Sequence, residues 1–237
     1  MKKIIPLFAI SNDYKEEVKQ YNHKDILLAV ILFLAYIGAM LFMGYLDKNK
    51  TITGVSLMIC GIGINILFSL ITIVFVLIRK QGLETIGLIQ GRYQLSLILG
   101  GILALILFTC NCILNVILED AIFKNIGVVV ILFFYYLSVA FVEEIMFRGY
   151  MLTRLYALTS NCFISMIMTG LLFVLMHFPY RMMIGINFMD LITNYSYLID
   201  LFITHCVLSY IYMKSKSLYG SILSHWMSDF GYGILIH

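Results

Sequence analysis

Two adjacent glutamates and an arginine lie within an apolar part of the chain, the stretch FVEEIMFRGYM at positions 141–151. Residues four apart share one face of a helix, whereas adjacent residues point about 100° apart. We therefore expect Glu144 and Arg148 to form an ion pair within one helix. That pairing would leave the carboxylate of Glu143 pointing elsewhere, free to accept a proton.

A histidine and an aspartate show the same spacing near the end of the chain. His225 and Asp229 are four residues apart in the stretch SILSHWMSDF, so they lie one turn apart on one helix face. A histidine oriented by a nearby acid is a common catalytic or metal-binding device. This pair is the second candidate for chemistry.

The elements that must position these residues are membrane helices. Hydrophobic residues make up 62% of the chain and charged residues 12%, against roughly 45–50% and 25% in soluble domains. Crossing a bilayer takes about 20 apolar residues. We predict an all-α, polytopic membrane bundle of about seven transmembrane helices. The apolar stretches run over 26–46, 54–78, 95–118, 126–147, 162–178, 195–213 and 218–236.

The basic residues indicate how the chain is oriented. Lys and Arg collect in cytoplasmic loops, and twelve of the 16 lie in the N-terminal arm and in alternate loops. We expect a multi-pass cell-membrane protein with a cytoplasmic arm at 1–24 and a transmembrane domain at 25–237. The net charge of +3 is small and scattered, so the sequence does not indicate binding to nucleic acid.

Ionisable residues within the predicted spans are concentrated in the C-terminal half. Such a residue costs several kcal/mol in a bilayer unless it is paired or hydrated, so each one is a functional candidate. The first three spans have almost none and are expected mainly to shape the protein. The candidates are Glu143, Glu144, His177, Asp200, His205, His225 and Asp229. Asp200 and His205 are five apart, about 140° around a helix, and we interpret them as a polar lining or a helix contact.

His177 can reach Glu143 if the chain turns between them. The two residues are 34 positions apart, and the polar pair Ser160 and Asn161 lies at the midpoint. A hairpin that turns there would bring Glu143 and His177 to the same depth, each about 25 Å from the turn. We therefore expect these two side chains to meet.

Three segments together carry a resemblance to a known family. EEIMFR, FVLMH and HWMSD resemble the EExxxR, FxxxH and HxxxN/D motifs of the CPBP family, the CAAX protease and bacteriocin-processing membrane proteins also called the Abi family. All three occur in family order, each in a different predicted span. The resemblance covers about the C-terminal half, 128–237.

This resemblance implies an intramembrane peptidase that activates water with a glutamate. Glu143 is similar to the family's general base, and Glu144 would support it alongside Arg148. His177 would hold the water or a metal. The substrate would be a peptide or a membrane-associated protein.

The third motif has two roles in such enzymes. His225 and Asp229 match a pair assigned either to metal binding or to stabilising the oxyanion, and the choice stays open here. A divalent metal such as Zn is often assigned to the family, with Glu143, His177 and His225 as its expected ligands in this chain. Its need is not settled for every member. Asp229 stands where the prenyl-protein peptidases of the family usually have asparagine.

Other functions compete with this hypothesis. A non-proteolytic membrane regulator or immunity protein could keep the fold and bind a partner membrane protein, in which case Glu143→Gln should be silent. The Glu-Glu-Arg cluster could be a structural ion pair at a helix end. Ion transport is weaker, because the first three spans offer no polar path. The composition, rich in Ile, Lys and Asn, favours a bacterial peptidase acting in peptide maturation or bacteriocin self-immunity.

Overall fold

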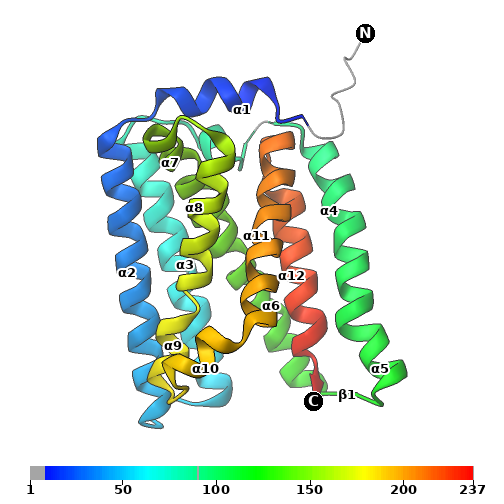
Figure 1. Cartoon of the computed structure of the whole chain (residues 1–237). Helices are drawn as coiled ribbons and strands as arrows, with labels where there is room; N and C mark the ends of the chain where they lie inside the picture. The colour runs from blue at the N-terminus through cyan, green and yellow to red at the C-terminus, as the bar shows by residue number, and fades with distance from the viewer. Residues whose placement is uncertain (1–8, 90, 237) are drawn as a thin grey trace.

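The protein is a bundle of helices (Figure 1). The computed structural model describes residues 9–89 and 91–236, so the first eight residues of the expected arm lie outside the described residues. The α-helices are α1 (Asn12–Glu17), α2 (His23–Lys48), α3 (Gly54–Ile78), α4 (Tyr93–Phe108), α5 (Leu114–Leu118), α6 (Ile126–Glu143), α7 (Leu152–Thr159), α8 (Cys162–Leu175), α9 (Phe178–Met183), α10 (Phe188–Thr193), α11 (Tyr195–Ser215) and α12 (Tyr219–Gly233). Two 3-10 helices, η1 (Val18–Gln20) and η2 (Leu83–Ile86), and two π-helices, η3 (Thr109–Ile113) and η4 (Glu144–Met151), complete the helical elements. The short strands β1 (Ile122–Phe123) and β2 (Leu235–Ile236) pair antiparallel, with Ile122 opposite Ile236.

The all-α polytopic bundle predicted from the sequence is confirmed, with a different number of spanning helices. Within the described residues, six helices are long and apolar enough to cross a membrane. The seventh expected span is α12, which has 15 residues. At 1.5 Å per residue it is about 22 Å long, and it is not among the six candidate spans. Helix α12 instead packs against α4 and α6.

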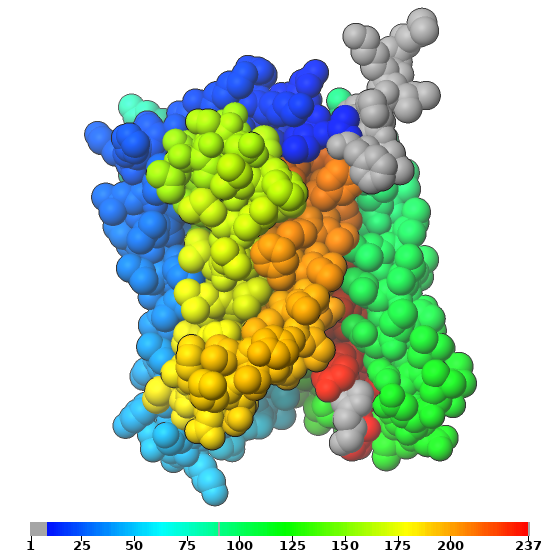
Figure 2. Space-filling model, in the orientation of Figure 1, coloured from blue at the N-terminus to red at the C-terminus, as the bar shows by residue number. Residues whose placement is uncertain are grey.

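The outer surface of the bundle is apolar, as a lipid environment requires. Leu34, Leu105 and Ile126 expose 61%, 69% and 74% of their surface. A soluble monomer rarely shows large continuous apolar patches, whereas lipid tails solvate such side chains. Figure 2 shows one face of the bundle, where α8 and α11 lie side by side, α10 lies below them and α1 crosses the edge above them.

Small residues allow α12 to approach α4 closely. A Cβ added at Gly220 would collide with the backbone of Ser96, and one at Gly100 would collide with the backbone of Gly220. The Gly220 N–H donates to Ser96 Oγ at 2.9 Å, and Ser224 Oγ donates to the Gly100 carbonyl at 3.1 Å. This tight crossing fixes α12, the helix that carries His225.

Helix α1 lies across one end of the bundle, which we call the α1 end (Figure 1). Tyr14 is fully buried, and the guanidinium of Arg154 lies 4.3 Å from the centre of the Tyr21 ring. Glu17 forms an ion pair of 2.5 Å with Lys216 at the end of α11. Helix α1 thus covers the α1 end, while α9 and α10 lie at the opposite end.

Candidate active site

One long helical element carries the first motif. Helices α6 and α7 are joined through the π-helix η4 and together form a single candidate span, Ile126–Thr159. The chain then turns at Ser160, which has a left-handed φ of 50°, and Asn161 caps α8 by accepting from the N–H groups of Phe163 and Ile164. The hairpin turn predicted at Ser160 and Asn161 is therefore confirmed.

The expected ion pair forms within η4. Arg148 Nη1 lies 3.0 Å from Glu144 Oε1, and both side chains are fully buried. The guanidinium also lies 4.4 Å from the centre of the Phe173 ring. Buried charges are tolerated when they are paired, so these contacts explain how an arginine can occupy the centre of the bundle. Short π-helical segments occur frequently at functional sites.

His225 connects the third motif to the first. Its Nδ1 lies 2.9 Å from Glu144 Oε1, and its Nε2 lies 3.4 Å from Asp229 Oδ2 and 3.6 Å from Glu143 Oε2. The predicted pairing of His225 with Asp229 is thus present. The contact with Glu144 was not predicted, because no local spacing indicates a contact across 81 residues.

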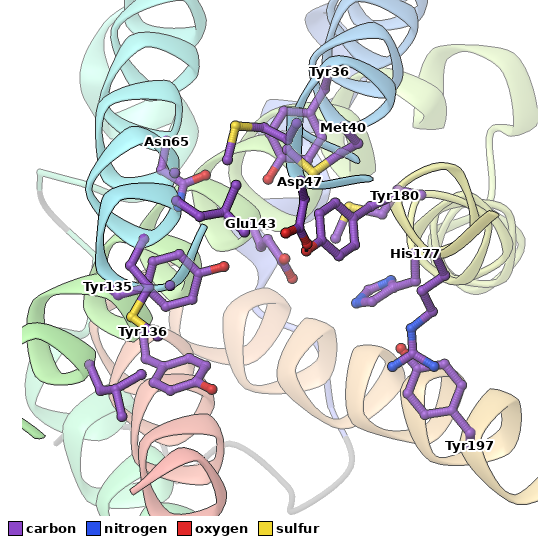
Figure 3. Close-up of a pocket in the computed structure, with 18 residues that line it drawn as sticks. Tyr36, Met40, Asp47, Asn65, Tyr135, Tyr136, Glu143, His177, Tyr180 and Tyr197 are labelled. Carbon is purple, nitrogen blue, oxygen red and sulfur yellow. The ribbon is translucent and has the colours of Figure 1, made fainter. Parts of the chain in front are cut away.

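Glu143 and His177 line the same cavity, which has a volume of about 470 Å³ (Figure 3). This arrangement agrees with the expectation that the hairpin brings the two residues to the same depth. Glu144 does not line this cavity, because it is held between Arg148 and His225. The two adjacent glutamates therefore face different surroundings, and Glu143 is the one that a molecule in the cavity would meet.

The ring orientation of His177 is fixed by one hydrogen bond. Its Nδ1 lies 2.8 Å from the carbonyl oxygen of Phe173. A carbonyl can only accept, so Nδ1 carries the proton and donates it. In neutral imidazole the other nitrogen, Nε2, then has a lone pair that can accept a hydrogen bond or bind a metal.

The expected metal ligands are not gathered into a metal-binding group. In the described part of the chain, no cluster of three or more His, Cys, Asp or Glu side chains could hold a metal ion as the side chains lie. The assignment of Glu143, His177 and His225 as ligands of a divalent metal such as Zn therefore stays a prediction.

The two remaining intramembrane candidates lie outside the cavity wall. His205 is fully buried, with Nε2 3.1 Å from Ser209 Oγ on the next turn of α11 and its ring 5.3 Å from the Phe173 ring. Asp200 is exposed on the same helix. Neither residue lines the cavity. His205 instead makes a helix contact, which is one of the two interpretations that the sequence left open.

The first three spans contribute more to the site than expected. Tyr36, Met40 and Asp47 of α2 line the cavity, as do Gly61 and Asn65 of α3. Sequence reasoning missed these residues because a Tyr or a Met in an apolar span most often serves packing. Asn65 was the available signal, since an amide in the middle of a span needs a partner.

Asn65 has that partner on the helix that carries Glu143. Its Nδ2 donates to Ser138 Oγ at 3.1 Å, and Asn65 is almost fully buried. This bond ties the cavity wall of α3 to α6. It helps fix the distance between the wall and the Glu143 carboxylate.

Comparison with known proteins supplies the family. No curated protein and no solved structure matches the chain. One family model matches residues 125–231, a range that includes the six site residues Glu143, Glu144, Arg148, His177, His225 and Asp229. That model is described as type II CAAX prenyl endopeptidase Rce1-like. Residues 125–231 are therefore an Rce1-like CAAX protease domain, which is the domain of a membrane hydrolase.

Proposed function

We propose that this protein is an intramembrane endopeptidase that hydrolyses a peptide bond with water activated by Glu143. One observation carries the proposal: of two adjacent buried glutamates, only Glu143 lines the cavity. Glu144 is held by Arg148 and His225, so it serves to position the others. A free carboxylate on the wall of a largely apolar cavity is suited to general base catalysis.

The reaction needs one water molecule and one reversible proton acceptor. Glu143 takes a proton from water as the water oxygen attacks the carbonyl carbon of the scissile bond. The C–N bond of the tetrahedral intermediate then breaks, and the protonated Glu143 gives its proton to the nitrogen of the leaving amine. The products are a carboxylic acid and an amine, and Glu143 is again a carboxylate.

His177 is placed to orient the attacking water. Its Nδ1–H is committed to the carbonyl of Phe173, so its Nε2 accepts a hydrogen bond in the neutral ring. A water molecule donating one hydrogen to Nε2 and the other to the Glu143 carboxylate would present an oxygen lone pair to the substrate. Holding a nucleophile in this way lowers the entropic part of the barrier.

His225 is placed to stabilise the oxyanion of the intermediate. Its Nδ1 donates to Glu144 at 2.9 Å, while its Nε2 faces carboxylate oxygens at 3.4 Å and 3.6 Å. A proton on Nε2 avoids lone-pair repulsion there, and both distances exceed those of an ordinary N–H···O bond. This N–H can therefore turn to a stronger acceptor, the developing oxyanion.

Every step above uses side chains of this protein. A divalent metal, when bound, would lower the pKa of its water and polarise the scissile carbonyl. Dialysis against a chelator, followed by adding back Zn²⁺, tests whether cleavage requires a metal ion bound by Glu143, His177 and His225. We propose no step that passes through it.

The positions of basic residues support a cytoplasmic α1 end. Ten of the twelve basic residues counted in the arm and alternate loops are among the described residues, and nine remain once Arg148, which is buried in η4, is left out. Cytoplasmic loops are enriched in such residues. The residues that line the cavity extend from Glu143 to Asp47, which lies in the last turn of α2. The cavity therefore extends toward the end of the bundle opposite the α1 end. We propose a bacterial cell-membrane location and peptide or membrane-protein substrates, in peptide maturation or bacteriocin self-immunity.

Comparing peptides from cells tests the proposal without assuming a substrate. Cells with the wild-type protein and cells with Glu143→Gln, at equal expression, are compared by mass spectrometry of membrane and secreted peptides. We expect some new chain termini in the wild-type cells alone. Identical peptide sets would reject proteolysis and favour a regulator that binds a partner membrane protein.

A further inference from the structure

The cavity contains a positive charge that the proposed reaction does not use. Among the described residues that line the cavity, Arg181 alone carries a permanent positive charge. Its guanidinium lies 4.0 Å from the centre of the Tyr197 ring. No carboxylate of the described residues lies within ion-pair distance of it. Asp47, the other acid in the wall besides Glu143, instead accepts a hydrogen bond of 2.6 Å from Tyr180.

Arg181 lies close to the reacting groups along the chain. It is four residues after His177, and both lie at or within the short helix α9. One turn of helix rises about 5.4 Å, so the backbone of Arg181 is about one turn from that of His177. Arg181 is partly exposed, unlike the buried Glu143. It therefore lies on the more open part of the wall.

Helix α9 is held firmly in place. A Cβ added to Gly44 of α2 would lie 2.6 Å from Met183 Cβ, so the two helices already touch at this point. The Tyr180 hydroxyl bonds to Asp47 at the end of α2. Because α9 is fixed and the guanidinium packs on the Tyr197 ring, the side chain of Arg181 is oriented before any ligand arrives. Such preorganisation favours binding.

We propose that Arg181, supported by Tyr197, is a specificity residue that binds a carboxylate of the peptide substrate. A guanidinium matches a carboxylate through two parallel hydrogen bonds, and it stacks readily on an aromatic ring. The rest of the wall includes Met40, Met43 and Met58, which suit apolar side chains. The favoured substrate is therefore an apolar peptide with one carboxylate near the bond that is cut. This inference rests on the proposed function.

The carboxylate can come from the end of the chain or from an acidic side chain, and labelling experiments separate the two. The protein is reconstituted in nanodiscs of phosphatidylcholine, with and without phosphatidylglycerol, in a Glu143→Gln background that prevents turnover. The probes are benzophenone-labelled hexapeptides of Ala, Leu and Met that end in a carboxylate or a carboxamide, and a carboxamide peptide with one Asp. We expect at least one carboxylate peptide to label about tenfold better than the neutral peptide.

The variants assign this preference to Arg181. Arg181→Gln should abolish it, Arg181→Lys should keep part of it, and Tyr197→Leu should weaken it. Lys48→Gln is the matched control, because Lys48 is exposed on the same end of α2 as Asp47 and does not line the cavity. This control should keep the full preference. If Arg181→Gln fails to fold, Arg181→Lys and Tyr197→Leu still decide the matter.

Three outcomes would overturn the inference. The first is a carboxylate preference that survives in Arg181→Gln, and the second is an equal loss of labelling for all three peptides. The third is an effect of Arg181→Gln confined to nanodiscs with phosphatidylglycerol, which would assign Arg181 to a lipid phosphate. Labelling reports binding alone. Cleavage that persists in Glu143→Gln would therefore reject the proposed function without deciding the role of Arg181.

Discussion

His225 lies against Glu144, with Nδ1 2.9 Å from Oε1, although the two residues are 81 positions apart in the chain. This hydrogen bond joins α12 to η4. It brings the third motif to the first and leaves Nε2 facing Glu143 and Asp229. The network explains why the two adjacent glutamates have different parts in the proposed reaction.

Arg148 is expected to be essential for stability. Removing one partner of a buried ion pair leaves an uncompensated charge, which costs about 3–5 kcal/mol. We predict that Arg148→Met lowers the free energy of unfolding by about this amount, measured by thermal or denaturant unfolding in detergent. Adding Glu144→Gln should restore part of the loss, because the amide oxygen still accepts from His225. A double variant less stable than Arg148→Met would contradict this explanation.

Helix geometry made much of this cluster predictable. Glu144 with Arg148, and His225 with Asp229, are one turn apart, and both pairs are present. The contact between His225 and Glu144 could not be predicted in this way. It depends on how α12 crosses α4 and α6, which is a property of packing and not of local spacing.

The cavity walls and the number of spans were harder to predict for similar reasons. Tyr36 and Asn65 lie in spans that hold almost no ionisable residue, and only the packing of α2 and α3 around α6 places them beside Glu143. Helix α12 is apolar, but with 15 residues it is not among the six candidate spans of the described residues. Division into an arm at 1–24 and a transmembrane domain at 25–237 stays a prediction.

Gly44 is expected to keep His177 in position through α9. A Cβ at Gly44 would lie 2.6 Å from Met183 Cβ and 3.0 Å from the carbonyl oxygen of Tyr180, so α9 would have to move. A misplacement of about 1 Å can cost up to about 100-fold in rate. We predict that Gly44→Ala lowers the cleavage rate by about tenfold or more.

Gly38 provides the control on the same helix, because a Cβ there would meet nothing within 4 Å. Gly38→Ala should cleave at the wild-type rate and be slightly more stable, by about 0.5–1 kcal/mol. Equal cleavage rates for Gly44→Ala and Gly38→Ala would show that α9 need not be fixed.

Asp229 is expected to support the reaction without accepting the proton of water. Its side chain is 34% exposed and lies 3.4 Å from His225 Nε2, and Asn would keep an oxygen acceptor at that place. We predict that Asp229→Asn retains cleavage to within about tenfold, since general base catalysis itself contributes about 100-fold to 10,000-fold. A loss as large as that of Glu143→Gln would instead identify Asp229 as the base.

The α1 end should respond to pH through Glu17. Burial raises the pKa of the Glu17 carboxyl above its ordinary value, and the Lys216 ammonium offsets this only in part. The folded protein therefore binds this proton more tightly than the unfolded chain, and the contribution of Glu17 to stability falls as pH rises between the two pKa values.

Glu17→Gln removes this pH dependence. We predict that the variant gains stability relative to the wild type as pH rises from 4 to 7, measured as the difference between the two Tm values. A variant that instead loses stability relative to the wild type over this range would mean that the ion pair with Lys216 outweighs burial.

The most direct test of the central claim is the cleavage rate of purified Glu143→Gln, measured beside Glu144→Gln and the wild type on a substrate identified from the cell comparison. We predict that Glu143→Gln loses about 100-fold to 10,000-fold in rate at an unchanged Tm, because it alters the cavity wall and leaves the Glu144–Arg148–His225 contacts intact. Cleavage by Glu143→Gln within tenfold of the wild type would contradict the assignment of Glu143 as the general base.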